Sequence, residues 1–76
     1  MNKLTDEQLS AISIFLEIEV VELFNMSLSE IKKKTKRLAK SRKMKLRDCL
    51  KETGAYRMLY DQEADLDTLV SLLNGR

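Results

Sequence analysis

Proline is absent from this chain, and its only two glycines stand at positions 54 and 75 of 76 residues. These two residue types most often end helices and form tight turns, so their scarcity argues against a loop-rich or multi-strand fold and favours long helices. A chain of this length forms one domain, spanning residues 1–76, and buries only about 60% of its unfolded surface. Its stability is therefore expected to be marginal unless something other than its own core stabilises the fold.

The usual additions to a small core are disulfides, a metal or a partner chain. Cys49 is the only cysteine and histidine is absent, which excludes an internal disulfide and a structural zinc site. We therefore expect no cofactor and no metal, and we expect a homodimer. The lone thiol and the lack of a long apolar run near the N-terminus predict a cytoplasmic location without a membrane span.

The first helix is predicted over residues 6–25. It begins with a capping box, in which Thr5 is the N-cap and Gln8 stands three residues later. Its apolar residues form two stripes on roughly opposite sides, so the helix should be covered on both. We assign the second side to a partner interface made of Ile14, Phe15, Ile18 and Val21. Residues 16–20 also alternate with the period of a strand, but helix is favoured because a lone strand has nothing to pair with.

Two further helices complete the predicted fold. Ser27 and Glu30 form a second capping box, so a helix should span residues 28–53 and end at Gly54. A third should span residues 55–73 and end at Asn74 and Gly75. Breaks near Ser41 and Asp61 remain open. The expected class is all-α, as a small antiparallel three-helix bundle.

Charge is segregated along the chain. Residues 5–30 hold six acids and no base, residues 32–47 ten bases and no acid, and residues 61–67 four acids and no base. In one continuous helix, six bases would lie on a single stripe roughly 27 Å long. They are the predicted nucleic-acid-binding residues: Lys33, Lys36, Lys40, Lys43, Arg47 and Lys51.

Such a stripe of like charges favours a compensating partner. Phosphates of DNA or RNA are the leading interpretation, because a basic helix face binds them by releasing counterions. Acids of this chain or of a protein partner are the second, and a solvated face is the third. Sequence-specific reading by a helix-turn-helix is poorly supported, because the only candidate turn, near Ser41, has no glycine.

The sequence gives little support for a catalytic site. Cys49 has no histidine to activate it and lies among apolar residues, so a buried structural thiol is expected. The acids of residues 61–67 lack the glycine and the final glutamate of a calcium-binding loop. Tyr56 and Tyr60, one helical turn apart, are expected at the rim of the core rather than stacked on bases.

We therefore expect a non-enzymatic regulatory or accessory protein that binds nucleic acid with residues 32–51. Compact chains with segregated charge suggest, by association, a phage or mobile-element regulator. The alternative is a protein–protein adaptor or inhibitor. It would dock on a larger target through its apolar first helix or its acidic third helix.

Overall fold

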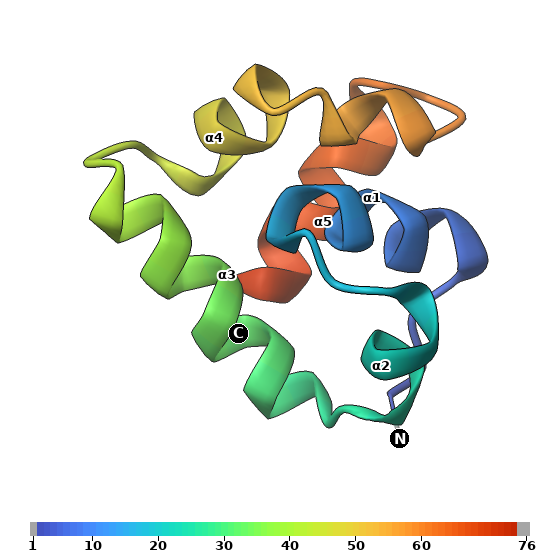
Figure 1. Ribbon diagram of the computed structural model, residues 1–76. Coiled ribbons are helices and arrows are strands. Elements are labelled where there is room, and N and C mark those ends of the chain that lie inside the picture. The colour runs from blue at the N-terminus through green and yellow to red at the C-terminus, as the bar shows by residue number, and fades with distance from the viewer. Residues whose placement is uncertain (1, 75–76) are drawn as a thin grey trace.

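The computed structural model describes residues 2–74, and across these residues the chain is all-helical with no strand. The expected all-α class is thus confirmed. Five α-helices and one short 3₁₀ helix follow one another (Figure 1): α1 (Asp6–Leu16), α2 (Val20–Asn25), α3 (Leu28–Ser41), α4 (Leu46–Glu52), η1 (Ala55–Met58) and α5 (Ala64–Leu73). The prediction of three long helices is wrong, because each predicted segment is divided.

Helix α1 begins as predicted and ends earlier than predicted. The Gln8 N–H donates to Thr5 Oγ1 at 3.2 Å, and the Thr5 N–H donates to Gln8 Oε1 at 3.0 Å, which completes the capping box. At Glu17 the backbone turns left-handed, with φ 56°. The Ile18 N–H then donates to the Ser13 carbonyl at 3.2 Å, and Ser13 Oγ donates back to the Ile18 carbonyl. Residues 16–20 therefore form a helix end and a turn, not a strand.

The turn at Glu17 explains the two apolar stripes of the predicted first helix. Because the chain folds back there, Phe15 of α1 and Leu23 of α2 both reach the same core. The side chain of Asn2 holds the end of α2, donating to the carbonyls of Leu23 and Met26 at 2.8 and 3.0 Å. Part of the apolar surface that was assigned to a second chain, including Phe15, is thus covered within this one.

The second predicted helix does break near Ser41, which the sequence left undecided. Ser27 caps α3 by accepting the Glu30 N–H at 3.2 Å, and α3 stops at Ser41. Helix α4 follows after a four-residue turn and is ended by Gly54, whose φ of 82° favours glycine. Both helices turn an apolar face to the core, with Ile31 and Leu50 fully buried.

The last predicted helix starts late. Residues 55–58 form only the 3₁₀ turn η1, and α5 begins at Ala64. Asp61 Oδ1 accepts the N–H groups of Glu63 and Ala64 at 3.0 and 2.9 Å, so Asp61 does split this segment. Asn74 is the C-cap of α5, and Gly75, also predicted to end this helix, lies outside the described residues.

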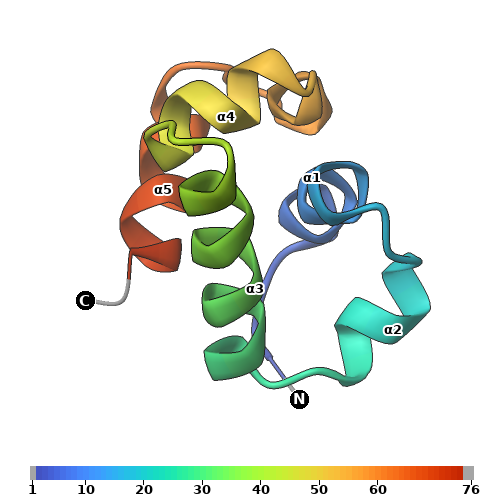
Figure 2. The ribbon, with the colours of Figure 1, turned by 60° about the vertical axis from the view of Figure 1, so that its left-hand side comes forward.

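A single core joins all the elements (Figures 1 and 2). Helix α1 contacts α2, α3 and η1, while α3 and α4 both contact α5. The largest fully buried apolar side chains come from every α-helix: Ile12, Leu23, Ile31, Leu50, Leu66, Leu69 and Leu73. Helix α3 thus packs against α1 and α5 with one face and leaves its other face to solvent (Figure 2).

Candidate nucleic-acid interface

The predicted basic stripe does not lie on one helix. Lys33, Lys36 and Lys40 are exposed on α3, Lys43 lies in the α3–α4 turn, and the last two bases lie on α4. The chain changes direction between the two helices, so a continuous stripe of six bases, as predicted, is wrong (Figure 1).

The turn itself depends on an unusual conformation of Lys43, whose φ is 56°. The Met44 N–H donates to the Ala39 carbonyl at 3.1 Å, and the Lys43 N–H donates to the Lys40 carbonyl at 3.0 Å. These two bonds form the Schellman motif, in which the left-handed position is most often glycine. The missing glycine is the reason that the turn was hard to recognise from sequence.

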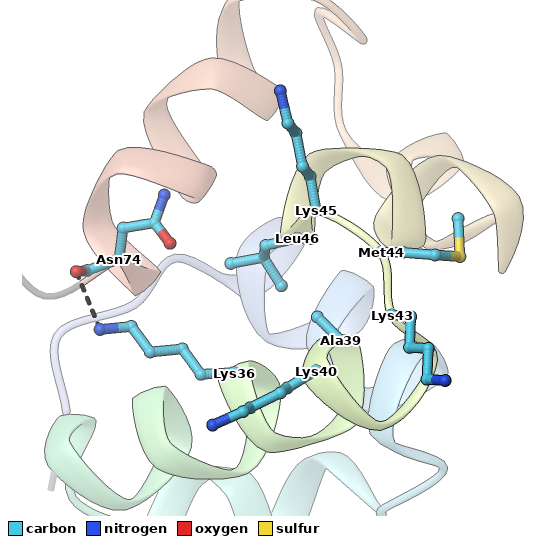
Figure 3. A pocket seen from close by; sticks show the side chains of 8 residues that line it. All are labelled: Lys36, Ala39, Lys40, Lys43, Met44, Lys45, Leu46 and Asn74. Carbon is cyan, nitrogen blue, oxygen red and sulfur yellow. Dashed lines mark hydrogen bonds between the residues drawn. The ribbon is translucent and has the colours of Figure 1, made fainter.

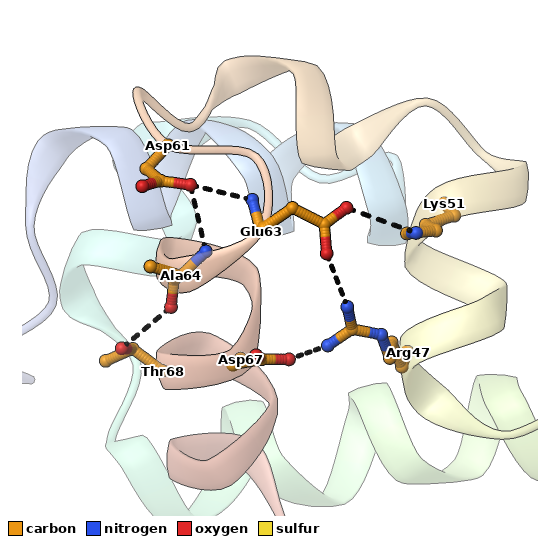
Figure 4. Close-up of polar contacts among 7 residues, drawn as sticks. All are labelled: Arg47, Lys51, Asp61, Glu63, Ala64, Asp67 and Thr68. Carbon is orange, nitrogen blue, oxygen red and sulfur yellow. Dashed lines mark hydrogen bonds and ion pairs between the residues drawn. The ribbon is translucent and has the colours of Figure 1, made fainter.

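Arg47 and Lys51 face the acids of the C-terminal segment (Figure 4). Arg47 forms ion pairs with Asp67 and with Glu63, the latter at 3.1 Å, and Lys51 lies 3.7 Å from Glu63. These pairs join α4 to the start of α5. The charges of these two bases are therefore compensated within the chain. The second interpretation of the stripe expected such compensation by acids of this chain.

The remaining acids near α5 also serve the fold. Asp61 accepts two backbone N–H groups, those of Ala64 and Glu63, and these bonds lower the pKa of its carboxyl below the ordinary value. Asp65 accepts the Asp61 N–H at 3.0 Å. Within residues 2–74, no cluster of three or more potential metal-ligating side chains is found.

A shallow basic groove lies where α3, the α3–α4 turn and the end of α5 meet (Figure 3). It has a volume of about 680 Å³, and its apolar lining residues are Ala39, Met44 and Leu46. Ala39 and Leu46 form its floor, whereas the Met44 side chain points away from Lys36. Its walls carry four lysines, together with the end of α5: Lys36, Lys40, Lys43, Lys45 and Asn74. Neither Lys45 nor Asn74 is among the binding residues predicted from the sequence.

One groove lysine is held in place by the backbone of α5. Lys36 Nζ donates to the Asn74 carbonyl at 2.9 Å, at the C-terminal end of the helix, where the helix dipole favours a cation. No ion pair to an acidic side chain is found for any of the other groove lysines within the described part of the chain. The groove is therefore a concentration of uncompensated positive charge over an apolar floor.

A second hollow lies on the opposite side of α3. Its volume is about 390 Å³, and it is bounded by the end of α1 and by the α1–α2 turn. Two bases of α3 line it beside apolar residues and a hydroxyl: Lys34, Arg37, Leu16, Ile18, Leu38 and Ser41. Helix α3 thus has a hollow with basic walls on each side.

The predicted partner interface is dispersed. Phe15 is only 2% exposed and packs in the core, so its assignment to a surface is wrong. Ile18 is half-buried against the core, while Ile14 and Val21 are 41% and 72% exposed. The break at Glu17 causes this separation, because it rotates the following residues away from the face of α1.

Helix α2 exposes two apolar side chains that were not predicted. Val20 is 42% exposed and Phe24 is 51% exposed. Their spacing places them with Val21 on one face of α2, on the outer side of the molecule. Glu17, Glu19 and Glu22 are exposed in the same segment, and the resulting surface, Val20, Val21 and Phe24, is called the α2 patch below.

The other residues considered for chemistry have structural surroundings. Cys49 is fully buried, and its burial raises the pKa of the thiol. Tyr56 is half-buried, with the Arg57 guanidinium 6.0 Å from the ring centre. Tyr60, expected at the core rim, is 89% exposed instead. None of the described helices is both long and apolar enough to cross a membrane.

Comparison with models of protein families, with curated proteins and with solved structures finds no match to this chain.

Proposed function

We propose that this protein is a small cytoplasmic, non-catalytic regulatory or accessory protein that binds nucleic acid through α3 and the α3–α4 turn. One observation supports this above all: residues 32–45 hold nine bases and no acid, and within residues 2–74 none of the nine forms an ion pair with an acidic side chain. Like charges at this spacing destabilise a helix, and a phosphate backbone removes that cost.

The proposed contact residues differ from the original stripe. Lys33, Lys36, Lys40 and Lys43 remain, and Lys45 joins them from the wall of the groove. Arg47 and Lys51 are left out, because their charge is already compensated by Glu63 and Asp67. The apolar floor of the groove supports the same function, since it lowers the local dielectric and strengthens the lysine–phosphate attraction.

The test is fluorescence anisotropy of labelled duplex DNA and single-stranded RNA at salt concentrations from about 50 to 200 mM. The variant Lys40→Gln/Lys45→Gln removes two uncompensated charges. Its matched control, Lys3→Gln/Lys51→Gln, removes two charges outside the proposed surface. For B-form DNA, each lost phosphate contact lowers the slope of log affinity against log salt by about 0.9.

We expect a steep salt dependence for the native chain, a slope reduced by about two in the groove variant, and little change in the control. Equal losses in both variants would mean that net charge alone, rather than this surface, governs binding. Absence of binding to either nucleic acid at low salt would refute the proposed function.

The α2 patch favours a second candidate function, docking on a protein. Its exposed apolar side chains lie in a segment with three glutamates and no base, which suits a partner whose apolar residues are flanked by lysine or arginine. A second copy of the chain is the other candidate. The variant Val21→Asp/Phe24→Asp should abolish either association while leaving the helix content unchanged. Light scattering of the native chain decides whether it forms a dimer, and an unchanged dimer in the variant would exclude the patch.

A further inference from the structure

The exposed basic residues of α3 spread over a wide arc of its solvent side and do not form a single stripe. Ile31, Thr35 and Ala39 are buried and define the inner face of the helix. The exposed bases occupy roughly 160° of the circumference at 3.6 residues per turn, opposite to that face. They are Lys33, Lys34, Lys36, Arg37 and Lys40. A helix that followed one phosphate strand would need bases along only one side.

The two hollows divide these bases into two flanks. Lys36 and Lys40 line the hollow beside the end of α5, and Lys34 and Arg37 line the hollow beside the end of α1. Helix α3 is thus a basic ridge with a recess on each side. In Figure 2, α3 lies between α5 and α1.

We infer that α3 inserts into the major groove of B-form DNA, with one phosphate strand on each flank. This inference rests on the proposed function and names its ligand as duplex DNA. The major groove of B-form DNA is about 12 Å wide and admits an α-helix, whose diameter with side chains is about 10–12 Å. The corresponding groove of double-stranded RNA is too narrow for a helix to enter.

The length of the ridge follows from the extent of α3. The 14 residues of α3 span about 21 Å at 1.5 Å per residue. The bases of the α3–α4 turn, among them Lys43 and Lys45, extend the flank beside α5 and meet the same strand. The acidic α2 segment and the paired acids of α5 belong to neighbouring elements. Within α3 itself the one acid is Glu30, which lies in the first turn of the helix. Residues 31–41 of α3 can therefore enter the groove without bringing carboxylates to the phosphates.

The decisive experiment uses three duplexes of one sequence: unmodified DNA, DNA with glucosylated hydroxymethylcytosine, and double-stranded RNA. The glucose groups fill the major groove and leave the phosphate charge unchanged. We expect affinity for the glucosylated DNA and for the RNA to fall about tenfold or more relative to unmodified DNA. Netropsin, which occupies the minor groove, should leave binding unchanged.

Equal affinity for unmodified and glucosylated DNA would overturn the inference and leave the proposed function standing, as would equal affinity for the RNA duplex. No binding to unmodified DNA at low salt would overturn the inference, and absence of binding to single-stranded RNA as well would overturn the proposed function. A second measurement uses one variant per flank, Lys34→Gln and Lys45→Gln, with Lys51→Gln as the control. Both flank variants should weaken DNA binding and lower the salt slope by about one each. A loss confined to one flank would show that α3 follows a single strand.

Discussion

The left-handed turn at Glu17 should respond measurably to glycine. Glu17 has φ 56° and ψ 43°, a conformation in which a Cβ atom costs roughly 1–2 kcal/mol. Glycine removes that cost, but its greater conformational freedom in the unfolded chain lowers the free energy of unfolding by about 0.5–1 kcal/mol. The substitution Glu17→Gly should therefore raise the free energy of unfolding by about 0.5–1 kcal/mol.

For a domain of this size, that increase corresponds to a rise in Tm of about 2–8 °C. Urea and thermal unfolding followed by far-UV circular dichroism measure it. Glu17→Ala is the matched control, because it removes the same charge from the C-terminal end of α1 but keeps a Cβ atom at positive φ. The difference in free energy of unfolding between the two variants gives the cost of the left-handed backbone at this residue. If Glu17→Gly is no more stable than Glu17→Ala, the turn is not left-handed at this residue, and the explanation for the broken helix fails.

Three further predictions concern the packing of α4 and α5. Arg47→Ala should lower the free energy of unfolding by about 0.5–1 kcal/mol, and a double-mutant cycle with Asp67→Ala should show coupling that vanishes in about 1 M salt. The lowered pKa of Asp61 means that the unfolded chain binds its proton at higher pH than the folded chain, so stability should fall as the pH drops below 3.8. Asp61→Asn should flatten that part of the pH profile, and an unchanged profile would exclude the capping carboxylate as its source. Cys49 should react with a thiol reagent only in denaturant, whereas rapid reaction of the native protein would contradict its burial.

Local chemistry explains what could be predicted about the fold. The caps at Thr5 and Ser27 and the glycine at position 54 act through neighbouring backbone groups, and all three are found where the sequence predicts them. The apolar face of residues 28–50 was also predictable, because its spacing persists across the break between α3 and α4. The absence of proline and the scarcity of glycine argued against a multi-strand fold, and no strand is found in the described residues.

The breaks at Glu17 and Lys43 could not be predicted in the same way, because neither residue prefers a left-handed backbone. Burial of Phe15 and Leu23 in one core favours the first break, and packing of α3 and α4 around α5 favours the second. The two breaks then determined where every candidate residue lies. Phe15 turned inward, while Val20 and Phe24 turned outward.

For the basic segment, the sequence by itself determined the density of positive charge and its separation from the acids along the chain. Only the tertiary structure decided which charges remain available. Arg47 and Lys51 meet acids that lie 12–20 residues further on, whereas the bases of α3 meet none within the described residues. The physical reason is that ion pairing depends on distances of a few ångströms between side chains, and those distances are set by how helices pack, not by their order in the sequence.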